Sequence, residues 1–459
     1  MTPLRIGIVG GGWAGMAAAV AACQAGHAVT VFEASRTLGG RARALPGSLP
    51  DGTPITLDNG QHILIGAYTE TLRLMRLVGL EPDALLLRQP LSLPFPDGTG
   101  LQTPSYATHW PAPFDAIAAI ATARGWTWGE RLSLIRASLG WQLRRFTCAP
   151  QWSVAQLCDG MAPRVLHELI EPLCVSALNT PADQASAQVF LKVMQDALFG
   201  VRGGSHLLLP RTDLSALFPV AAAQRITQRG GEVNLGHRVG SLRWQAPHWL
   251  VDGQAFDRVV WATSSSNAAT ALAEYSHSAT TSIATALQAW AATAAALRFE
   301  AIATVYAWAP QARLPHPMLA LRNSASAPAQ FVFDRGQLGG PTGLLAFVVS
   351  ASDGSREVLQ TAVLQQAAAQ LGPIGVPALL PVQTVVEKQA TFACTPGLQR
   401  PPQAIAPGLL AAGDYVQGPY PATLEGAVRS GWSAGRQAMV GLRADHAGVA
   451  SVTSVTKPA

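Results

Sequence analysis

Short apolar runs and one longer stretch of small apolar residues alternate at the start of the chain. Residues 4–9 form a run of mainly aliphatic side chains, which is typical of a buried parallel strand. The pattern then predicts a helix from about residue 13 to 25, which Gly26 would end, and a second strand over 28–32. The alternation therefore predicts a strand–helix–strand unit.

A glycine-rich turn joins this first strand to the helix. In the pattern G-x-G-x-x-G the first glycine permits the turn, the second lets backbone approach a pyrophosphate, and the third lets helix and strand pack closely. The helix N-terminus would offer N–H groups to phosphates, and an acid about twenty residues on would accept from ribose hydroxyls. We therefore predict a dinucleotide site made by Gly10, Gly12, Trp13, Ala14, Gly15 and Glu33.

A similar order of strand, glycine and helix returns near the other end of the chain. Residues 409–412 form a short apolar strand, Gly413 and Asp414 follow, and a helix is predicted from about Thr423. Between the two ends, residues 229–244 predict a hairpin-like pair of strands, and 256–265 predict a buried strand. We expect these distant segments to build one parallel sheet.

The segments between these strands have mainly helical apolar patterns, at 114–123, 132–141, 165–178 and 189–199. We predict that residues 1–75, 216–265 and 401–445 bind the cofactor. Residues 76–215 would form a mostly helical first part of a substrate domain, and 266–400 a second part with sheet and helices. Residues 446–459 are expected to be a flexible tail.

The composition narrows the function. The chain is 49% hydrophobic and only 13% charged, against a typical charged share of about 25%, which favours an apolar cavity and an apolar substrate. No run of about 18 uninterrupted apolar residues predicts a membrane span. The five cysteines lack a CxxC motif and are expected to be free thiols in a reducing compartment.

Charge and motif content exclude further classes. No dense Lys/Arg run predicts nucleic-acid binding, and no spacing of His, Cys, Asp and Glu predicts a metal site. The net charge of +5 suits an anionic membrane surface, although it is also compatible with no such partner. Because the motifs of hydrolases and kinases are missing too, the cofactor itself is expected to carry the chemistry.

Gly39-Gly40-Arg41 resembles the second glycine pair of the FAD-binding glutathione-reductase-like superfamily, and Gly413-Asp414 resembles its C-terminal motif. The resemblance implies an α/β fold, in which a discontinuous Rossmann-like FAD-binding domain of glutathione-reductase type carries an inserted α+β substrate domain. It implies FAD contacts from Gly39, Gly40 and Arg41 at the diphosphate, Val239 at adenine, Gly413 and Asp414 at ribitol, Thr423 and Leu424 at the pyrimidine ring, and Gly60, Gln61 and His62 beside the isoalloxazine. Alternatively, the loop with Arg41 is only a solvated basic loop.

Five further stretches, at 57–75, 174–200, 206–219, 330–336 and 389–401, resemble the hydroxysqualene dehydroxylases, a group of squalene-associated FAD-dependent enzymes of bacterial hopanoid and squalene biosynthesis. The resemblance spans about residues 4–440 and departs from the group at Gln389 and Cys394. It implies that reduced FAD delivers a hydride to the allylic carbon of hydroxysqualene, whose hydroxyl leaves, giving squalene. His62 and Asp334 are the candidates for assisting that departure; alternatively, His62 only packs under the flavin and Asp334 only pairs with an arginine.

Two other functions stay open. The same fold works oxidatively in carotenoid-type desaturases and amine oxidases, and it carries prenyl chains without redox chemistry in Rab-escort-type proteins. For the dehydroxylase we expect an unidentified reductant of the flavin and a cytoplasmic location, peripheral on the inner membrane face. Residues 110–145, rich in Trp, Phe and Arg, are the expected membrane contact.

Overall fold

The computed structural model describes residues 2–110 and 113–439. The predicted tail at 446–459 and the last residues of the segment 401–445 lie outside this part of the chain. Within it, one six-stranded sheet has five parallel strands and an antiparallel edge strand. Its order is β10 (Glu232–Leu235), β2 (Ala28–Glu33), β1 (Arg5–Val9), β14 (Arg258–Trp261), β21 (Leu409–Ala411) and β20 (Ala404–Ala406).

Helices cover one face of this sheet. They are α1 (Trp13–Gln24), α10 (Pro219–Gln228) and α14 (Leu424–Gln437), and they share a buried core with Ile6 and Ile8 of β1. Helices α1 and α14 touch through backbone: a Cβ added at Gly431 would lie 2.0 Å from the carbonyl oxygen of Ala14. This close approach fixes the helix of the C-terminal segment against the helix of the N-terminal segment.

The opposite face of the sheet is covered by a small antiparallel sheet and a helix pair. The sheet contains β11 (Leu242–Gln245), β12 (His248–Val251) and β13 (Gln254–Phe256), and the helices are α11 (Ser265–Ser276) and α12 (Thr281–Ala295). Gly7 on β1 leaves room for the ring of Phe256, which lies 3.2 Å from where its Cβ would be.

A second large sheet is antiparallel and lies over the cavity described below. Its order is β16 (Met318–Ala320), β17 (Phe331–Asp334), β18 (Leu344–Ser350), β15 (Phe299–Trp308) and β19 (Leu380–Phe392). Helix α13 (Arg356–Leu371) packs against one face, where Val332 and Phe347 are buried. The alternate residues Phe331, Phe333 and Val348 face the cavity, as the period of two along a strand requires.

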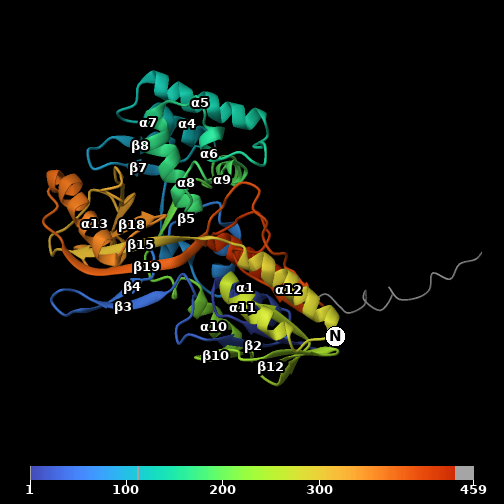
Figure 1. Cartoon of the computed structure of the whole chain (residues 1–459). Helices are drawn as coiled ribbons and strands as arrows, with labels where there is room; N and C mark the ends of the chain where they lie inside the picture. Colours follow the sequence, from blue (N-terminus) through green and yellow to red (C-terminus); the bar gives the residue numbers. More distant parts are fainter. Residues whose placement is uncertain (1, 111–112, 440–459) are drawn as a thin grey trace, which may run out of the picture.

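The remaining helices gather at the end of the molecule farthest from the parallel sheet (Figure 1). They are α4 (Phe114–Ala121), α5 (Trp128–Leu143), α6 (Val154–Leu157), α7 (Pro163–Val165), a π-helical turn (Leu166–Ile170), α8 (Glu171–Leu178) and α9 (Ala187–Phe199). The other elements are α2 (Thr69–Leu77), α3 (Pro82–Leu85) and the strands β3 (Ala44–Ser48), β4 (Pro54–Asp58), β5 (Leu64–Ile65), β6 (Leu86–Gln89), β7 (Ser92–Pro94), β8 (Gly100–Gln102) and β9 (Leu207–Pro210), of which β7 and β8 lie beside α4 (Figure 1). Short 3₁₀ turns occur at Ser105–Ala107, Arg335–Leu338 and Gly372–Ile374.

The predicted strands and helices of the parallel sheet are confirmed, but the predicted hairpin over 229–244 is wrong. Strand β10 pairs in parallel with β2, whereas β11 pairs with β12. The reason is the turn at Gly236, whose φ of +71° redirects the chain after β10, while its N–H donates to the carbonyl of Ser35. The domain limits stay predictions; α11 and α12, which follow the limit at 265, pack on the parallel sheet.

Candidate active site

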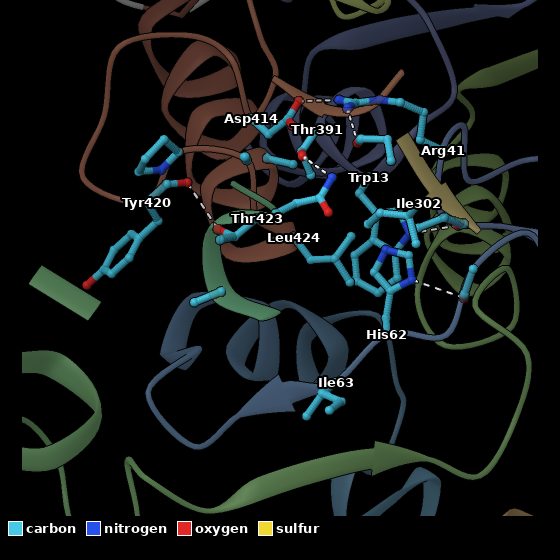
Figure 2. Close-up of a pocket in the computed structure, with 18 of the residues that line it drawn as sticks. Trp13, Arg41, His62, Ile63, Ile302, Thr391, Asp414, Tyr420, Thr423 and Leu424 are labelled. Carbon is cyan, nitrogen blue, oxygen red and sulfur yellow. Dashed lines mark hydrogen bonds and ion pairs between the residues drawn. The ribbon is translucent and has the colours of Figure 1, made fainter. Parts of the chain in front are cut away.

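One cavity of about 730 Å³ reaches from the parallel sheet into the helices at the other end. It is lined by every residue predicted to contact FAD except Gly15. Figure 2 shows the cofactor side, where Arg41, Asp414 and Thr423 lie across from Trp13 and His62.

The three predicted glycines fall into two kinds. Gly10 has a φ of +114° and a Cβ there would lie 2.6 Å from the Ala262 carbonyl oxygen; at Gly15 it would lie 1.9 Å from that of Gly10. Gly12 has no such constraint, because the nearest protein atom to its Cβ would be 3.8 Å away. The fold thus requires Gly10 and Gly15, whereas the open space in front of Gly12, at the start of α1, is available to a ligand.

Glu33 lies at the end of β2, beside this turn. Its carboxylate accepts from the N–H of Gly11 at 2.6 Å and of Ser35 at 2.7 Å. The side chain is thereby fixed at the cavity wall with further acceptor sites on its oxygens, as a ribose-binding acid needs. Val239 lines the same part of the cavity, and its carbonyl accepts from the Tyr275 hydroxyl at 3.2 Å.

The second glycine pair lies next to the first. Gly39 donates to the Gly11 carbonyl, and the Cβ of Gly40 would lie 3.4 Å from the Cα of Gly12. Arg41 donates to the carboxylate of Asp414 and, at 2.7 Å, to the carbonyl of Ala390 (Figure 2). This ion pair joins residues 373 positions apart and brings the two predicted cofactor motifs together.

The C-terminal motif presents the start of a helix to the cavity. Thr423 is the N-cap of α14, and its hydroxyl accepts from the N–H of Gly426 at 2.9 Å. Thr423 and Leu424 line the cavity together with Gly413 and Asp414. The positive end of the helix dipole therefore faces the space predicted for the flavin.

The segment 57–66 turns from polar to apolar at the cavity wall. Gly60, Gln61 and His62 line it, and Ile63 and Ile65 follow. A Cβ at Gly60 would make no contact closer than 3.6 Å. A Cβ there would therefore make only an ordinary contact with the His62 ring, and packing against the protein does not require a glycine at this position.

His62 is held by its own loop. Its Nδ1 lies 3.2 Å from the Gly60 carbonyl, so Nδ1 carries the proton and Nε2 is the acceptor of the neutral ring. Burial, and to a smaller extent the charge of Arg41, lower the pKa of His62. A neutral imidazole with its acceptor side free is poorly suited to protonate a leaving group.

The Gln61 side chain is held by a buried network of two ionisable residues, Arg335 and Asp58. Arg335 donates to the Gln61 side chain at 3.2 Å and lies 3.8 Å from the carboxylate of Asp58. Burial raises the pKa of Asp58 to about 6, against the N–H of Leu214 and the charge of Arg335, which lower it. Asp58 and Arg335 belong to the stretches 57–75 and 330–336, but these lie far apart in the chain, so their contact could not be predicted from sequence.

Asp334 does not line the cavity, and the expectation that it assists chemistry is not supported. The side chain is buried, caps the 3₁₀ turn that follows β17, and accepts from the N–H of Leu314 at 3.1 Å and the side chain of Gln337 at 2.8 Å. Its carboxylate is used for capping, because its Oδ1 accepts from the N–H of Gln337 at the start of this turn.

The two residues at which the chain departs from the resembled group, Gln389 and Cys394, have different surroundings. Gln389 lines the cavity and accepts from the Ser266 hydroxyl at 2.8 Å. Cys394 is buried, and its backbone bonds to Thr180 and Ser186. Asn179, from the resembled stretch 174–200, also lines the cavity; it adopts a left-handed conformation (φ 46°) and bonds to Thr391 and Ala351, which ties α8 to the antiparallel sheet.

The donor set fits FAD. Gly12 and Gly60 line the cavity and are not required by close protein contacts, two motifs supply a phosphate-binding helix start and a ribose acid, and a second helix start faces the ring site. The hydroxyl of Tyr415, buried at the cavity, has no hydrogen-bond partner among the described residues. Such an unused polar atom is expected where a cofactor completes the site.

Comparison with known proteins also indicates a flavin cofactor. A family model described as flavin containing amine oxidoreductase matches residues 13–439. The hydroxysqualene dehydroxylase of Rhodopseudomonas palustris is 27% identical over 472 residues, covering 92% of this chain and 96% of that protein. The zeta-carotene desaturase of Synechocystis is 39% identical over 83 residues, covering 18% of this chain and 16% of that protein.

Among solved structures, cyclohexylamine oxidase from Brevibacterium oxydans superposes with a TM-score of 0.63 at 16% identity, covering 95% of this chain and 98% of that chain. The matches confirm the predicted fold class and FAD as the cofactor.

Proposed function

The chain belongs to the flavin-containing amine oxidoreductase family, and on this premise we propose that it is a hydroxysqualene dehydroxylase. In the proposed reaction the C–O bond of the allylic alcohol breaks, the oxygen leaves as water after gaining a proton, and the carbon gains a hydride. The substrate is thus reduced by two electrons. FAD, when bound in its reduced form, supplies the hydride, and an unidentified donor must reduce it again.

The observation that carries this proposal is the apolar extension of the cavity beyond the cofactor side. Helices α4, α5, α8 and α9 contribute wall residues, and the antiparallel sheet closes one side. The apolar residues of this wall are Leu91, Leu93, Leu101, Ala116, Ile120, Leu134, Trp141, Leu169, Ile170, Leu173, Val193, Met194, Leu198, Ile302, Phe331, Phe333 and Val348. A long hydrocarbon fits such a wall, which also excludes water from an electron-deficient carbon. The likeness to the Rhodopseudomonas dehydroxylase over nearly the full length of both chains supports the same substrate.

Oxidative alternatives receive less support. The carotene desaturase resembles less than a fifth of this chain. The likeness to cyclohexylamine oxidase is at 16% identity and supports the fold alone. A prenyl carrier without redox chemistry would not need the paired cofactor motifs, and the yellow colour of a purified flavoprotein would exclude it.

The test uses purified protein reduced by light under anaerobic conditions. Addition of hydroxysqualene should restore the absorbance of oxidised flavin and yield squalene in equal amount. Squalene added instead is the control and should leave the spectrum bleached. A spectrum that also stays bleached with hydroxysqualene would contradict the proposed function.

We further propose that α4 and α5 contact an anionic bilayer, from which the substrate enters. Both helices are apolar on two faces: Ala116, Ile120 and Leu134 line the cavity, while other large side chains of this region are exposed to solvent. The exposed set is Tyr106, Trp110, Phe114, Ile117, Trp128, Leu132, Leu139 and Leu143. On α5 its members lie at the spacing i, i+4, i+11 and i+15, which places them on one face.

The charge around this surface supports an anionic partner. Arg124, Arg136, Arg144 and Arg145 are exposed in the same region, which suits phosphate headgroups. Among the described residues no helix is long and apolar enough to cross a membrane, so the proposed contact is peripheral.

Co-sedimentation with phosphatidylglycerol vesicles tests this contact. Replacing Trp110 and Phe114 with alanine, or Leu132 and Leu143 with glutamate, should abolish it, whereas Val358→Glu, an exposed apolar residue on α13, should not. Absence of binding by the unaltered protein would refute the contact without affecting the dehydroxylase proposal.

A further inference from the structure

A polar cluster interrupts the apolar wall of the cavity. Asp196 on α9 and Tyr420, in the loop before α14, both line it. The residues beside Asp196 on the wall, Val193 and Ala197, are apolar. Because polar groups in an apolar wall are costly unless they are bonded, these two side chains need an explanation.

Asp196 has unused capacity to accept hydrogen bonds. Lys192 donates to its Oδ1 at 2.8 Å. Its Oδ2 is buried; the Tyr420 hydroxyl lies within reach of this carboxylate, but no hydrogen bond of ordinary geometry reaches Oδ2 within the described part of the chain. A ligand group that donates a hydrogen bond would satisfy this carboxylate.

Tyr420 supplies the complementary donor. Burial, and then the adjacent carboxylate of Asp196, raise the pKa of Tyr420 to about 12, so the phenol keeps its proton at neutral pH. The guanidinium of Arg429 and the ammonium of Lys192 lie over its ring at 4.8 and 5.9 Å. Arg429 lowers the pKa of Tyr420 and so favours a phenolate if the proton leaves, while the charges of Asp196 and Glu425 oppose it.

The cluster lies where the cofactor side meets the apolar extension. Tyr420 follows Asp414 and precedes Thr423, whose hydroxyl donates to the Tyr420 carbonyl at 3.0 Å. Figure 2 shows the Tyr420 side chain pointing away from the pair of Arg41 and Asp414. Asp196 comes from a helix of the opposite end of the molecule, so both parts of the protein contribute to the cluster.

We propose that Asp196 and Tyr420 bind the hydroxyl group of an allylic isoprenoid alcohol. The alcohol O–H donates to Asp196, and the Tyr420 hydroxyl donates to the alcohol oxygen. This inference rests on the proposed dehydroxylase function and assigns the acid that the sequence analysis sought in His62 and Asp334.

The cluster also accounts for the proton that the reaction needs. As the C–O bond breaks, both of its electrons go to the oxygen, and the Tyr420 proton completes the departing water. The carbon takes the hydride that reduced FAD supplies when bound. Tyr420 regains a proton from solvent after the product leaves, while Arg429 offsets part of its transient negative charge.

Binding to the oxidised holoenzyme tests the proposal without turnover, because oxidised flavin cannot reduce the substrate. Dissociation constants of hydroxysqualene and of squalene are measured by the change in flavin absorbance. The unaltered enzyme should prefer the alcohol about tenfold, as two hydrogen bonds imply. Tyr420→Phe and Asp196→Asn should lose this preference and leave the affinity for squalene unchanged.

Tyr420→Phe should also slow reoxidation of the photoreduced enzyme by hydroxysqualene about a hundredfold or more at saturation. Asp159→Asn, which changes an exposed residue outside the cavity, is the matched control. If Asp196→Asn does not retain FAD, the binding and rate measurements on Tyr420→Phe alone test the proposal, since this substitution removes only the hydroxyl.

Two failures are distinguishable. If the unaltered enzyme is reoxidised but the variants keep both preference and rate, this inference alone is overturned. If the unaltered enzyme is not reoxidised by hydroxysqualene, the proposed function fails, and the inference fails with it.

Discussion

The two ends of the cavity are built by different means. The cofactor end is built from backbone at glycines and helix starts, together with the side chains of two acids, and Gly10 and Gly15 have contacts that tolerate almost no other residue. The apolar end uses side chains from several helices and one sheet, and many residues of similar size would serve there. The first kind of wall depends on exact residues at exact spacings, whereas the second depends on total shape.

The largest expected effects distinguish a glycine that the fold requires from one that the cofactor requires, both in the cofactor end. Gly15→Ala places a Cβ 1.9 Å from a backbone oxygen, and we expect a loss of about 3 kcal/mol or more in the free energy of unfolding. Gly12→Ala creates no such clash, so the apoprotein should unfold at the same urea concentration while FAD affinity falls at least tenfold. Equal stability losses in both variants would show that Gly12 is also required by the fold.

A smaller effect is expected when a residue of the apolar end is changed, and it should alter hydrocarbon binding without altering FAD binding. Leu173→Gln puts a polar group into the apolar wall, and we expect about 10- to 30-fold weaker binding of squalene, measured by the flavin absorbance of the holoenzyme. FAD content and FAD affinity should not change. A parallel loss of FAD would mean that the two ends are coupled and that the comparison is too simple.

The network behind Gln61 predicts a pH dependence. The pKa of Asp58 is raised to about 6 from its unfolded value of about 3.9, so the folded state holds the proton more tightly. Its contribution to stability is therefore complete below about pH 4 and is lost as the pH rises through 6, by up to about 3 kcal/mol.

Urea unfolding at several pH values measures this contribution. Asp58→Asn, which keeps an acceptor for the Leu214 N–H, should remove that part of the pH dependence. If the difference between the variant and the unaltered protein is the same at pH 4 and pH 7, Asp58 does not titrate in this range.

The smallest effect is expected at His62. Since its neutral ring bonds to the Gly60 carbonyl, His62→Ala should lower FAD affinity only a few-fold and leave the rate of anaerobic reoxidation nearly unchanged. A loss of a hundredfold or more in that rate, with FAD retained, would restore His62 as a catalytic residue and weaken the assignment of Tyr420.

The cofactor end could be predicted from sequence because its physical demands fall on single residues. Gly10, Gly15 and Thr423 each meet a local backbone requirement that short motifs record. Asp196 could not be found this way, since nothing in the pattern of α9 distinguishes an acid at the cavity from one in water. Asp334 misled for the same reason: an acid after a strand is also a common cap, and only the fold shows which of the two it is.

The pairing of Arg41 with Asp414 has a consequence for biosynthesis. Ribosomes release the N-terminal glycine turn hundreds of residues before the segment that completes the site. A nascent chain therefore lacks one side of the FAD-binding site until β21 and α14 have emerged from the ribosome and packed against the N-terminal segment. FAD loading should consequently follow translation, and chains truncated before Asp414 should be made without cofactor and be left to cellular proteases.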